Sequence, residues 1–364
     1  MKRGVLVLLT VAVVLCMMAC SDDDKEKEQK AVDDGTYEVA MIIENKSVND
    51  GGFNQATWES IRKFSGERDL SCNYYASKEA STDSYIESVK SAIDKGAKLV
   101  IFSGSDFEVA AYEAQTLYPE TCFLTIDGVP HSEKGTYATK ENTISITFAE
   151  EESGFLAGYA AVRDGYKSMG FIGGKDVPAV KRYGYGFVQG AEAAAEEFAG
   201  SGDSKKIQLK YMYTGTFDKS EDVKAKAQEW YKDGTQVIFA CGGAMNKSVI
   251  AAAEGENGKV IGSDTNQGSM SDTVITSAEK NISPAVENVL RDFAAGKFVG
   301  GMAFNYAAKN DGVKLDMKNG KFNTFSQDDY NKIFRQLKDG RIKLEKDTEV
   351  KSVKELLGDY IVLN

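Results

Sequence analysis

Short apolar runs alternate with longer amphipathic stretches from residue 37 onward. Uninterrupted runs rich in β-branched residues predict strands buried on both faces of a sheet, at residues 39–43, 99–102, 122–126, 169–172, 237–240, 259–262 and 273–277. Between them, apolar residues spaced three and four apart, such as Ile86, Val89 and Ile93, predict helices with one apolar stripe. The repeated strand–helix order predicts an α/β fold in which helices cover both faces of parallel sheets.

This strand–helix cycle occurs twice, which predicts two doubly wound parallel-sheet lobes joined by a hinge. We assign residues 36–147 and part of about 265–305 to lobe 1, and residues 148–264 and part of about 306–364 to lobe 2. The chain would then cross between the lobes more than once. In open α/β sheets, ligands bind beyond the carboxyl ends of the strands. Two facing lobes therefore predict one interlobe cleft, lined by the residues that follow the strands.

The first residues of the chain are predicted to export it and to anchor it. Lys2 and Arg3 precede fifteen apolar or small residues at 5–19, fewer than the ~20 needed to span a bilayer, so residues 1–19 are interpreted as a signal peptide. The residues before Cys20 resemble a bacterial lipobox, with Met where Leu is usual. We favour lipidation at Cys20, by palmitate-type acyl chains, over plain secretion with cleavage near Ala19.

Residues 21–35 are predicted to form a tether. Ten of these fifteen residues are charged and almost none is apolar, so the stretch has no means of forming a core of its own. Together with Cys20 it would hold the folded part near a membrane. We therefore expect a lipoprotein of the bacterial cell envelope that faces away from the cytoplasm.

Composition narrows the possible functions. The 364 residues include 44 Lys and Arg against 55 Asp and Glu, a formal net charge of −11, and an acidic chain without a basic run offers no surface for nucleic acid. The one histidine, His131, excludes zinc sites with several histidines and two-histidine iron sites, and disfavours an enzyme. We interpret His131 as a solvated loop residue, and we expect no catalytic residue, no cofactor and no metal.

The cysteines beyond the leader point to packing rather than chemistry. They are three in number and widely spaced, which describes neither a disulfide framework nor a metal site. Each lies in a run that resembles a strand, so we interpret them as small core residues: Cys72, Cys122 and Cys241.

The residues that follow the predicted strands suggest the chemistry of the cleft. They include carboxylates, glycines, two phenylalanines and one lysine; among them are Glu44, Phe53, Asp127, Phe217, Asp264 and Lys280. Carboxylates accept paired hydrogen bonds from hydroxyl groups, and aromatic faces hold a flat ring by stacking. This set suits a polar, hydroxyl-bearing molecule that carries a flat ring.

Six segments in order also carry a family resemblance. They are DGGFNQ at 50–55 with Trp58, FLAGYAA at 155–161, GFIGG at 170–174 with GYGFVQG at 184–190, TGTFD at 214–218, IGSD at 261–264 with Gln267, and ITS at 275–277 with Lys280. The series spans about residues 37–305 and resembles the basic membrane protein family. The best-understood members of that family are purine nucleoside-binding lipoproteins that feed ABC transporters.

The resemblance implies a type I periplasmic-binding-protein fold with a nucleoside between the lobes. By position, Phe53 and Phe217 would sandwich the base, one from each lobe. Asn54 and Asp127 would hydrogen-bond the edge of the base. Asp264 would hold the ribose hydroxyls.

Three further positions complete the implied site. Lys280 would pair with Asp264 or reach the sugar. Glu44 stands where family members usually have Asp, and its extra methylene would alter that ligand contact. Gly243 would offer a backbone contact, although the segment around it lacks a glycine common in the family.

The sequence thus predicts a solute-binding lipoprotein that captures nucleosides, purine nucleosides first, for the permease of an ABC importer. A cleft rich in carboxylates favours a neutral nucleoside over a nucleotide. Two alternatives stay open at this point: an anchored adhesin or sensor that binds another small solute such as a sugar, and a nucleoside-processing enzyme.

Overall fold

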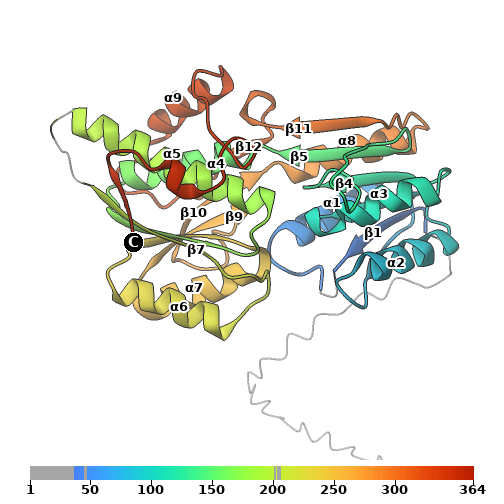
Figure 1. Cartoon of the computed structure of the whole chain (residues 1–364), viewed down its shortest axis with the longest axis horizontal. Coiled ribbons are helices and arrows are strands. Elements are labelled where there is room, and N and C mark those ends of the chain that lie inside the picture. The colour runs from blue at the N-terminus through green and yellow to red at the C-terminus, as the bar shows by residue number, and fades with distance from the viewer. Residues whose placement is uncertain (1–36, 45–46, 201, 203–205) are drawn as a thin grey trace, which may run out of the picture. The chain divides into compact units, whose positions relative to one another are not determined.

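Two β-sheets, each flanked by helices, form the framework of the chain (Figure 1). The computed structural model describes residues 37–364 except 45–46, 201 and 203–205. The predicted signal peptide, the lipidated Cys20 and the tether lie outside the described residues. The described residues belong to one compact unit, so the two sheets and the space between them can be described together.

The first sheet, which forms lobe 1, has six strands among the described residues, in the order β11-β5-β4-β3-β1-β2. All neighbouring strands in it run parallel. The strands are β1 (Val39–Ile43), β2 (Cys72–Ala76), β3 (Leu99–Ser103), β4 (Cys122–Ile126), β5 (Thr143–Phe148) and β11 (Met302–Tyr306).

The second sheet, which forms lobe 2, has seven strands in the described part of the chain, in the order β12-β10-β9-β8-β6-β7-β13. Its pairs are parallel except for β10 with β12. The strands are β6 (Ser168–Gly173), β7 (Ile207–Tyr213), β8 (Val237–Cys241), β9 (Lys259–Asp264), β10 (Val274–Lys280), β12 (Val313–Leu315) and β13 (Ile361–Leu363).

Helices cover both faces of each sheet, as the strand–helix alternation predicts. They are α1 (Phe53–Glu67), α2 (Thr82–Asp94), α3 (Glu108–Leu117), α4 (Glu150–Arg163), α5 (Pro178–Gly200), α6 (Glu221–Lys232), α7 (Asn246–Glu256), α8 (Ile282–Ala294) and α9 (Gln327–Lys338). Short 3₁₀ turns lie at Ser105–Phe107, Gly243–Met245, Ala308–Asn310 and Val353–Leu356. None of the helices in the described ranges is long and apolar enough to span a bilayer.

The alternation of side chains along β1 shows how a strand buries both of its faces. Val39, Met41 and Ile43 pack into the core shared with α1 and α8, whereas Ala40 and Ile42 pack into the core formed with α2 and α3. All five side chains are buried, because a parallel strand between two helical layers has no solvent-facing side. In lobe 2, α4 and α5 cover one face of the sheet and α6 and α7 the other.

The chain crosses between the two sheets three times. It leaves lobe 1 through β5 and α4, returns from β10 through α8 to β11, and crosses back to β12. Of residues 265–305, the part up to Lys280 stays in the second sheet, and the part from Ile282 on lies with lobe 1, where α8 packs against α1. These crossovers are the segments that connect the two lobes.

Helices α4 and α5 approach each other closely through glycines that belong to the segments quoted above. A Cβ atom at Gly158 would lie 2.0 Å from the carbonyl oxygen of Phe187, and one at Gly190 would lie 2.0 Å from that of Phe155. Real Cβ atoms do not approach oxygen so closely. The GYGFVQG segment is therefore a helix-packing surface.

The structure contains strands that the apolar runs did not indicate, namely β5, β7, β11, β12 and β13, while β2 was indicated only by the run around Cys72. Most of them lie at or next to a sheet edge, where polar and apolar residues alternate instead of forming a continuous run.

The interpretation of His131 as a solvated residue is wrong. Its ring is partly buried, with Nε2 3.3 Å from Glu108 Oε2 and Nδ1 2.8 Å from the Ser132 carbonyl oxygen. The three described cysteines are free and lie in β2, β4 and β8.

Candidate functional site

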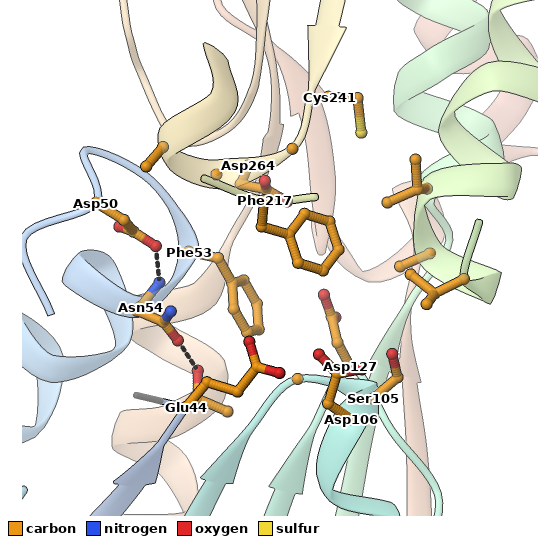
Figure 2. Close-up of a pocket in the computed structure, with 18 of the residues that line it drawn as sticks. Glu44, Asp50, Phe53, Asn54, Ser105, Asp106, Asp127, Phe217, Cys241 and Asp264 are labelled. Atoms are coloured by element: carbon orange, nitrogen blue, oxygen red, sulfur yellow. Dashed lines mark hydrogen bonds between the residues drawn. The ribbon is translucent and has the colours of Figure 1, made fainter. Parts of the chain in front are cut away.

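A cavity of about 530 Å³ lies at the carboxyl ends of the strands of both sheets (Figure 2). Residues of both lobes line it, as the topology of two facing α/β lobes predicts. All eight residues proposed from the sequence are among those that line it: Glu44, Phe53, Asn54, Asp127, Phe217, Gly243, Asp264 and Lys280. The structure thus brings together in one space side chains that are up to 236 positions apart in the sequence, from Glu44 to Lys280.

The strand ends turn into the cavity with a left-handed backbone. Gly104 follows β3 with φ of 117°, Asp127 follows β4 with 60°, Gly243 lies shortly after β8 with 57°, and Asp264 ends β9 with 66°. This conformation is costly for most L-residues, but Gly adopts it freely and Asp tolerates it. The sharp turn directs both Asp side chains toward the cavity rather than along the strand.

Phe53 and Asn54 are positioned by the start of α1. The Asp50 carboxylate accepts hydrogen bonds from the backbone N–H groups of Gly52, Asn54 and Gln55, and so caps a helix end whose N-cap residue, Gly52, has no side chain to do so. Burial raises the pKa of Asp50, against the opposing effect of these N–H donors. The Asn54 side chain accepts a hydrogen bond through Oδ1 from Ser103 Oγ at 2.9 Å.

Phe217 enters the cavity from lobe 2, and Figure 2 shows its ring and that of Phe53 both turned into the same space. The place of the Phe217 ring depends on Gly174, where a Cβ atom would lie 2.4 Å from Cδ1 of Phe217. Gly243 is open on its cavity side, since a Cβ atom at this position would have no neighbour nearer than 3.8 Å. Its backbone is therefore accessible to a ligand.

Lys280 is the centre of a buried charge cluster that joins the lobes. Its side chain is 1% exposed, and its ammonium contacts Asp127 Oδ2, Glu150 Oε1 at 3.2 Å and Asp264 Oδ1 at 3.3 Å. The ammonium also lies 5.0 Å from the centre of the Phe53 ring, within the range of a cation–π contact. The sequence indicated a pairing of Lys280 with Asp264; the structure adds Asp127 and Glu150.

The cluster contains three carboxylates and one ammonium, and this excess of negative charge shifts the pKa values of its groups. Burial alone would lower the pKa of Lys280, but the three carboxylates outweigh burial and raise it well above its usual range, so the ammonium stays charged. Burial raises the pKa of Asp127 to about 7; Lys280 opposes this shift, and Glu150 and Asp264 add to it. Asp127 is therefore a carboxyl group that changes charge near neutral pH.

Asp127 also carries an unsatisfied atom. Within the described ranges, its buried Oδ1 has no hydrogen-bond partner, while its Oδ2 is bound to Lys280. An unpaired buried carboxylate oxygen costs free energy, so it marks a position where a ligand donor would be stabilising. Asp264 differs in this respect: it accepts hydrogen bonds from Tyr183 at 3.4 Å and from Ser263 at 3.2 Å.

Glu44 lines the cavity, but its carboxylate is engaged with other protein groups. Its Oε1 accepts hydrogen bonds from Tyr85 Oη at 3.3 Å and from Lys175 Nζ at 3.1 Å. Lys175 belongs to lobe 2, so this pair spans the cleft.

Sequence reasoning missed several residues of the site. Glu150, buried at the start of α4, lies between Lys280 and Arg182, whose Nη1 is 3.7 Å from Glu150 Oε2. Glu150 belongs to a run of three acidic residues at 150–152 that the sequence shows plainly. The position of this run at the cavity follows only if β5 is recognised as a strand, and the threonines and serine of β5 do not resemble a buried strand. Asp50, although part of the DGGFNQ segment, and Lys175 were likewise not proposed as site residues.

Comparison with known proteins places the chain among substrate-binding proteins. A family profile described as "ABC transporter substrate-binding protein PnrA-like" (Bmp) matches residues 37–348. The nucleoside-binding protein BmpA of an ABC transporter from Lactococcus lactis subsp. cremoris strain MG1363 is 28% identical over 344 residues, which cover 88% of this chain and 93% of that protein. Basic membrane protein D of Borreliella burgdorferi strain JD1 is 27% identical over 343 residues, covering 92% and 94%.

A solved structure shares the fold. The solute-binding protein of an ABC transporter system from Aeropyrum pernix K1 superposes with a TM-score of 0.75 at 18% identity, covering 88% of this chain and 97% of that one. The type I periplasmic-binding-protein fold expected from the sequence is confirmed by this likeness.

Proposed function

Since this chain belongs to the PnrA-like family of ABC transporter substrate-binding proteins, we propose that it binds purine nucleosides in the interlobe cavity and delivers them to the permease of an ABC importer. The observation that carries the proposal is the buried, unpartnered Oδ1 of Asp127 in a cavity that also holds the rings of Phe53 and Phe217. A flat base with a hydrogen-bond donor on its edge fits both features. Stacking on aromatic rings contributes about 0.5–1.5 kcal/mol per pair beyond area burial.

The polar groups at the base edge support a purine that carries an oxygen at position 6. Asp127 Oδ1 is an acceptor, and it suits the N1–H of hypoxanthine or guanine. The Oδ1 of Asn54 is bound to Ser103, which leaves the Asn54 amide protons to donate to an acceptor atom of the same base. Adenine has a hydrogen-bond acceptor at N1, so this atom cannot donate a hydrogen bond to the ionised Asp127.

The charge of the cavity supports a neutral ligand. Six carboxylates and two lysines line it among the described residues: Glu44, Asp50, Asp106, Asp127, Asp218 and Asp264 against Lys219 and Lys280. Lys280 is already shared by three carboxylates. The phosphate of a nucleotide would be repelled, whereas ribose hydroxyls would donate to Asp264.

Delivery requires a place near the permease. We propose that Cys20 carries lipid and holds the protein on the outer side of a bacterial membrane, with residues 21–35 as the tether. Closure of the lobes about the crossovers would give the form that docks on the permease. This role makes the protein a carrier of its solute, and we expect no turnover.

The test is to identify the solute directly. The protein purified without added ligand is denatured, and the released small molecule is identified by mass spectrometry. Isothermal titration with inosine, guanosine and adenosine then measures affinity, and we expect the first two to bind more tightly at pH 8. Release of a sugar, with no nucleoside binding, would contradict the proposal and favour a different solute. Free base after incubation with nucleoside would instead indicate an enzyme.

A further inference from the structure

Lys175 connects the two lobes at a place away from the crossovers. It lies in lobe 2, between β6 and α5, and its ammonium is 3.1 Å from Glu44 Oε1 and 2.7 Å from Asp106 Oδ2. Both partners belong to lobe 1: Glu44 follows β1, and Asp106 lies in the 3₁₀ turn after β3. One ammonium of lobe 2 thus holds two carboxylates of lobe 1, and both carboxylates line the cavity.

This triad is partly shielded from water. The side chains of Lys175, Glu44 and Asp106 are 27%, 15% and 29% exposed. Burial alone would lower the pKa of Lys175, but Asp106 and Glu44 outweigh it and raise the pKa, so the ammonium is charged at neutral pH. Its Nζ also lies 5.3 Å from the centre of the Phe217 ring. Such a pair contributes more than a fully exposed one, because screening is weaker.

The position of the triad ties it to lobe motion. Lys280 immediately precedes the crossover helix α8, so rotation about the hinge moves it little relative to lobe 1. None of the three residues of the triad adjoins a crossover, and their contacts must break for the lobes to separate. Phe217, which we propose to stack on the base, lies directly against Lys175.

We propose that Lys175, Glu44 and Asp106 form an interlobe latch that holds the lobes closed over the bound solute and slows its release. The latch also gives a reason for Glu44, where an aspartate would be one methylene shorter and its carboxylate correspondingly farther from Lys175. Glu44 then acts on the ligand through closure. The inference rests on the proposed function, because the solute whose release it slows is the nucleoside.

The dissociation rate tests the latch. Full-length protein is loaded with tritiated inosine and mixed with excess unlabelled inosine, and rapid filtration follows the loss of bound radioactivity. We expect Lys175→Met and Asp106→Asn each to release the inosine about tenfold faster. The double variant should be no faster than Lys175→Met alone, since both remove the same contact. The acceleration should shrink between about 0.05 and about 0.5 M NaCl.

Lys210→Met is the matched control. Lys210 is 19% exposed and pairs with Asp233, but both residues lie in lobe 2 and no contact across the cleft is lost. Its release rate should equal that of the wild type. Equal rates for wild type and Lys175→Met would overturn the latch. So would a Lys175→Met variant that releases nucleoside normally but has lost binding of a nucleoside 5′-monophosphate, which would assign Lys175 to a phosphate.

A second measurement separates the latch from the proposed function. If the wild type binds no nucleoside, the proposed function fails, but the latch is still tested by the distance between the lobes. Spin labels are attached through ketone-bearing residues that replace Lys90 of α2 and Lys232 of α6, both exposed. Dipolar spectroscopy should show fewer closed molecules in Lys175→Met than in wild type or Lys210→Met. Identical distance distributions would refute the latch.

Discussion

The substitution Asp127→Asn tests the role of Asp127 Oδ1, a buried acceptor in the cavity that has no hydrogen-bond partner among the described residues. It keeps the size of the side chain and removes its charge. The hydrogen bond from Lys280 to Oδ2 is retained, because an amide oxygen also accepts, and Lys280 still pairs with Glu150 and Asp264. The fold is therefore expected to survive, and thermal unfolding serves as the control.

The magnitude follows from the type of bond that is lost. A hydrogen bond to a charged group contributes about 1.5–3 kcal/mol, and about 1.4 kcal/mol is a factor of ten, so inosine affinity should fall roughly 10- to 150-fold when Asp127 is ionised. The pKa of Asp127 is raised to about 7, so the carboxylate form dominates at pH 8 and is roughly one-tenth of the population at pH 6. Wild-type affinity for inosine should thus rise with pH, whereas the amide does not titrate.

Isothermal titration at pH 6, 7 and 8 measures both effects. The ratio of wild-type to Asp127→Asn affinity for inosine should be largest at pH 8 and about tenfold smaller at pH 6. Adenosine, with an acceptor at N1, should lose less affinity on the same substitution. A ratio that does not change with pH, or an equal loss for both nucleosides, would refute the assignment of Asp127 to a base donor.

Three further substitutions test the Phe53 ring, the Lys280 charge cluster and the packing of α4 against α5. Phe53→Ala should weaken nucleoside binding at least tenfold by titration, because stacking and the contact with Lys280 are lost, while the exposed Phe304→Ala on β11 should not change it. Lys280→Met removes the ammonium shared by three buried carboxylates, leaving Glu150 with Arg182 alone, and should cost about 3–5 kcal/mol of unfolding free energy at pH 8. Since carboxylates take up protons as pH falls, that loss should be smaller at pH 5.5; a loss independent of pH would contradict the charge explanation. Gly158→Ala should cost about 2 kcal/mol or more in urea unfolding because its Cβ would meet the Phe187 carbonyl, whereas Gly66→Ala, with open space around it, should be neutral or stabilising.

The sequence was informative where the signal is local. Buried strands such as β1 and β8 are continuous apolar runs, and the residues after them lie at the cavity by the geometry of parallel sheets. The ordered motif series identified the family, and this identification is confirmed. Phe53, Asp127 and Asp264 were each found because they follow a recognisable strand or open a recognisable helix.

Contacts between residues that are far apart in the sequence could not be predicted from it. Lys280 and Asp127 are 153 positions apart, and no local pattern indicates that their side chains meet. Glu150 follows β5, where Thr143 and Ser145 are buried and the hydroxyl of Ser145 is satisfied by Thr125. A strand with buried hydroxyl groups does not differ in composition from a loop, so the carboxylate after it was not recognised as part of the site.

The three crossovers also limit how the two lobes can be exchanged by recombination. β11 completes the first sheet, although it follows β10 in the chain, and β12 and β13 then return to the second sheet. A break anywhere between β6 and β10 would divide both sheets at once. Neither lobe is therefore a module that recombination could exchange alone, and the two halves of the cleft evolve as one unit: a change of specificity must arise by substitution within the existing pair.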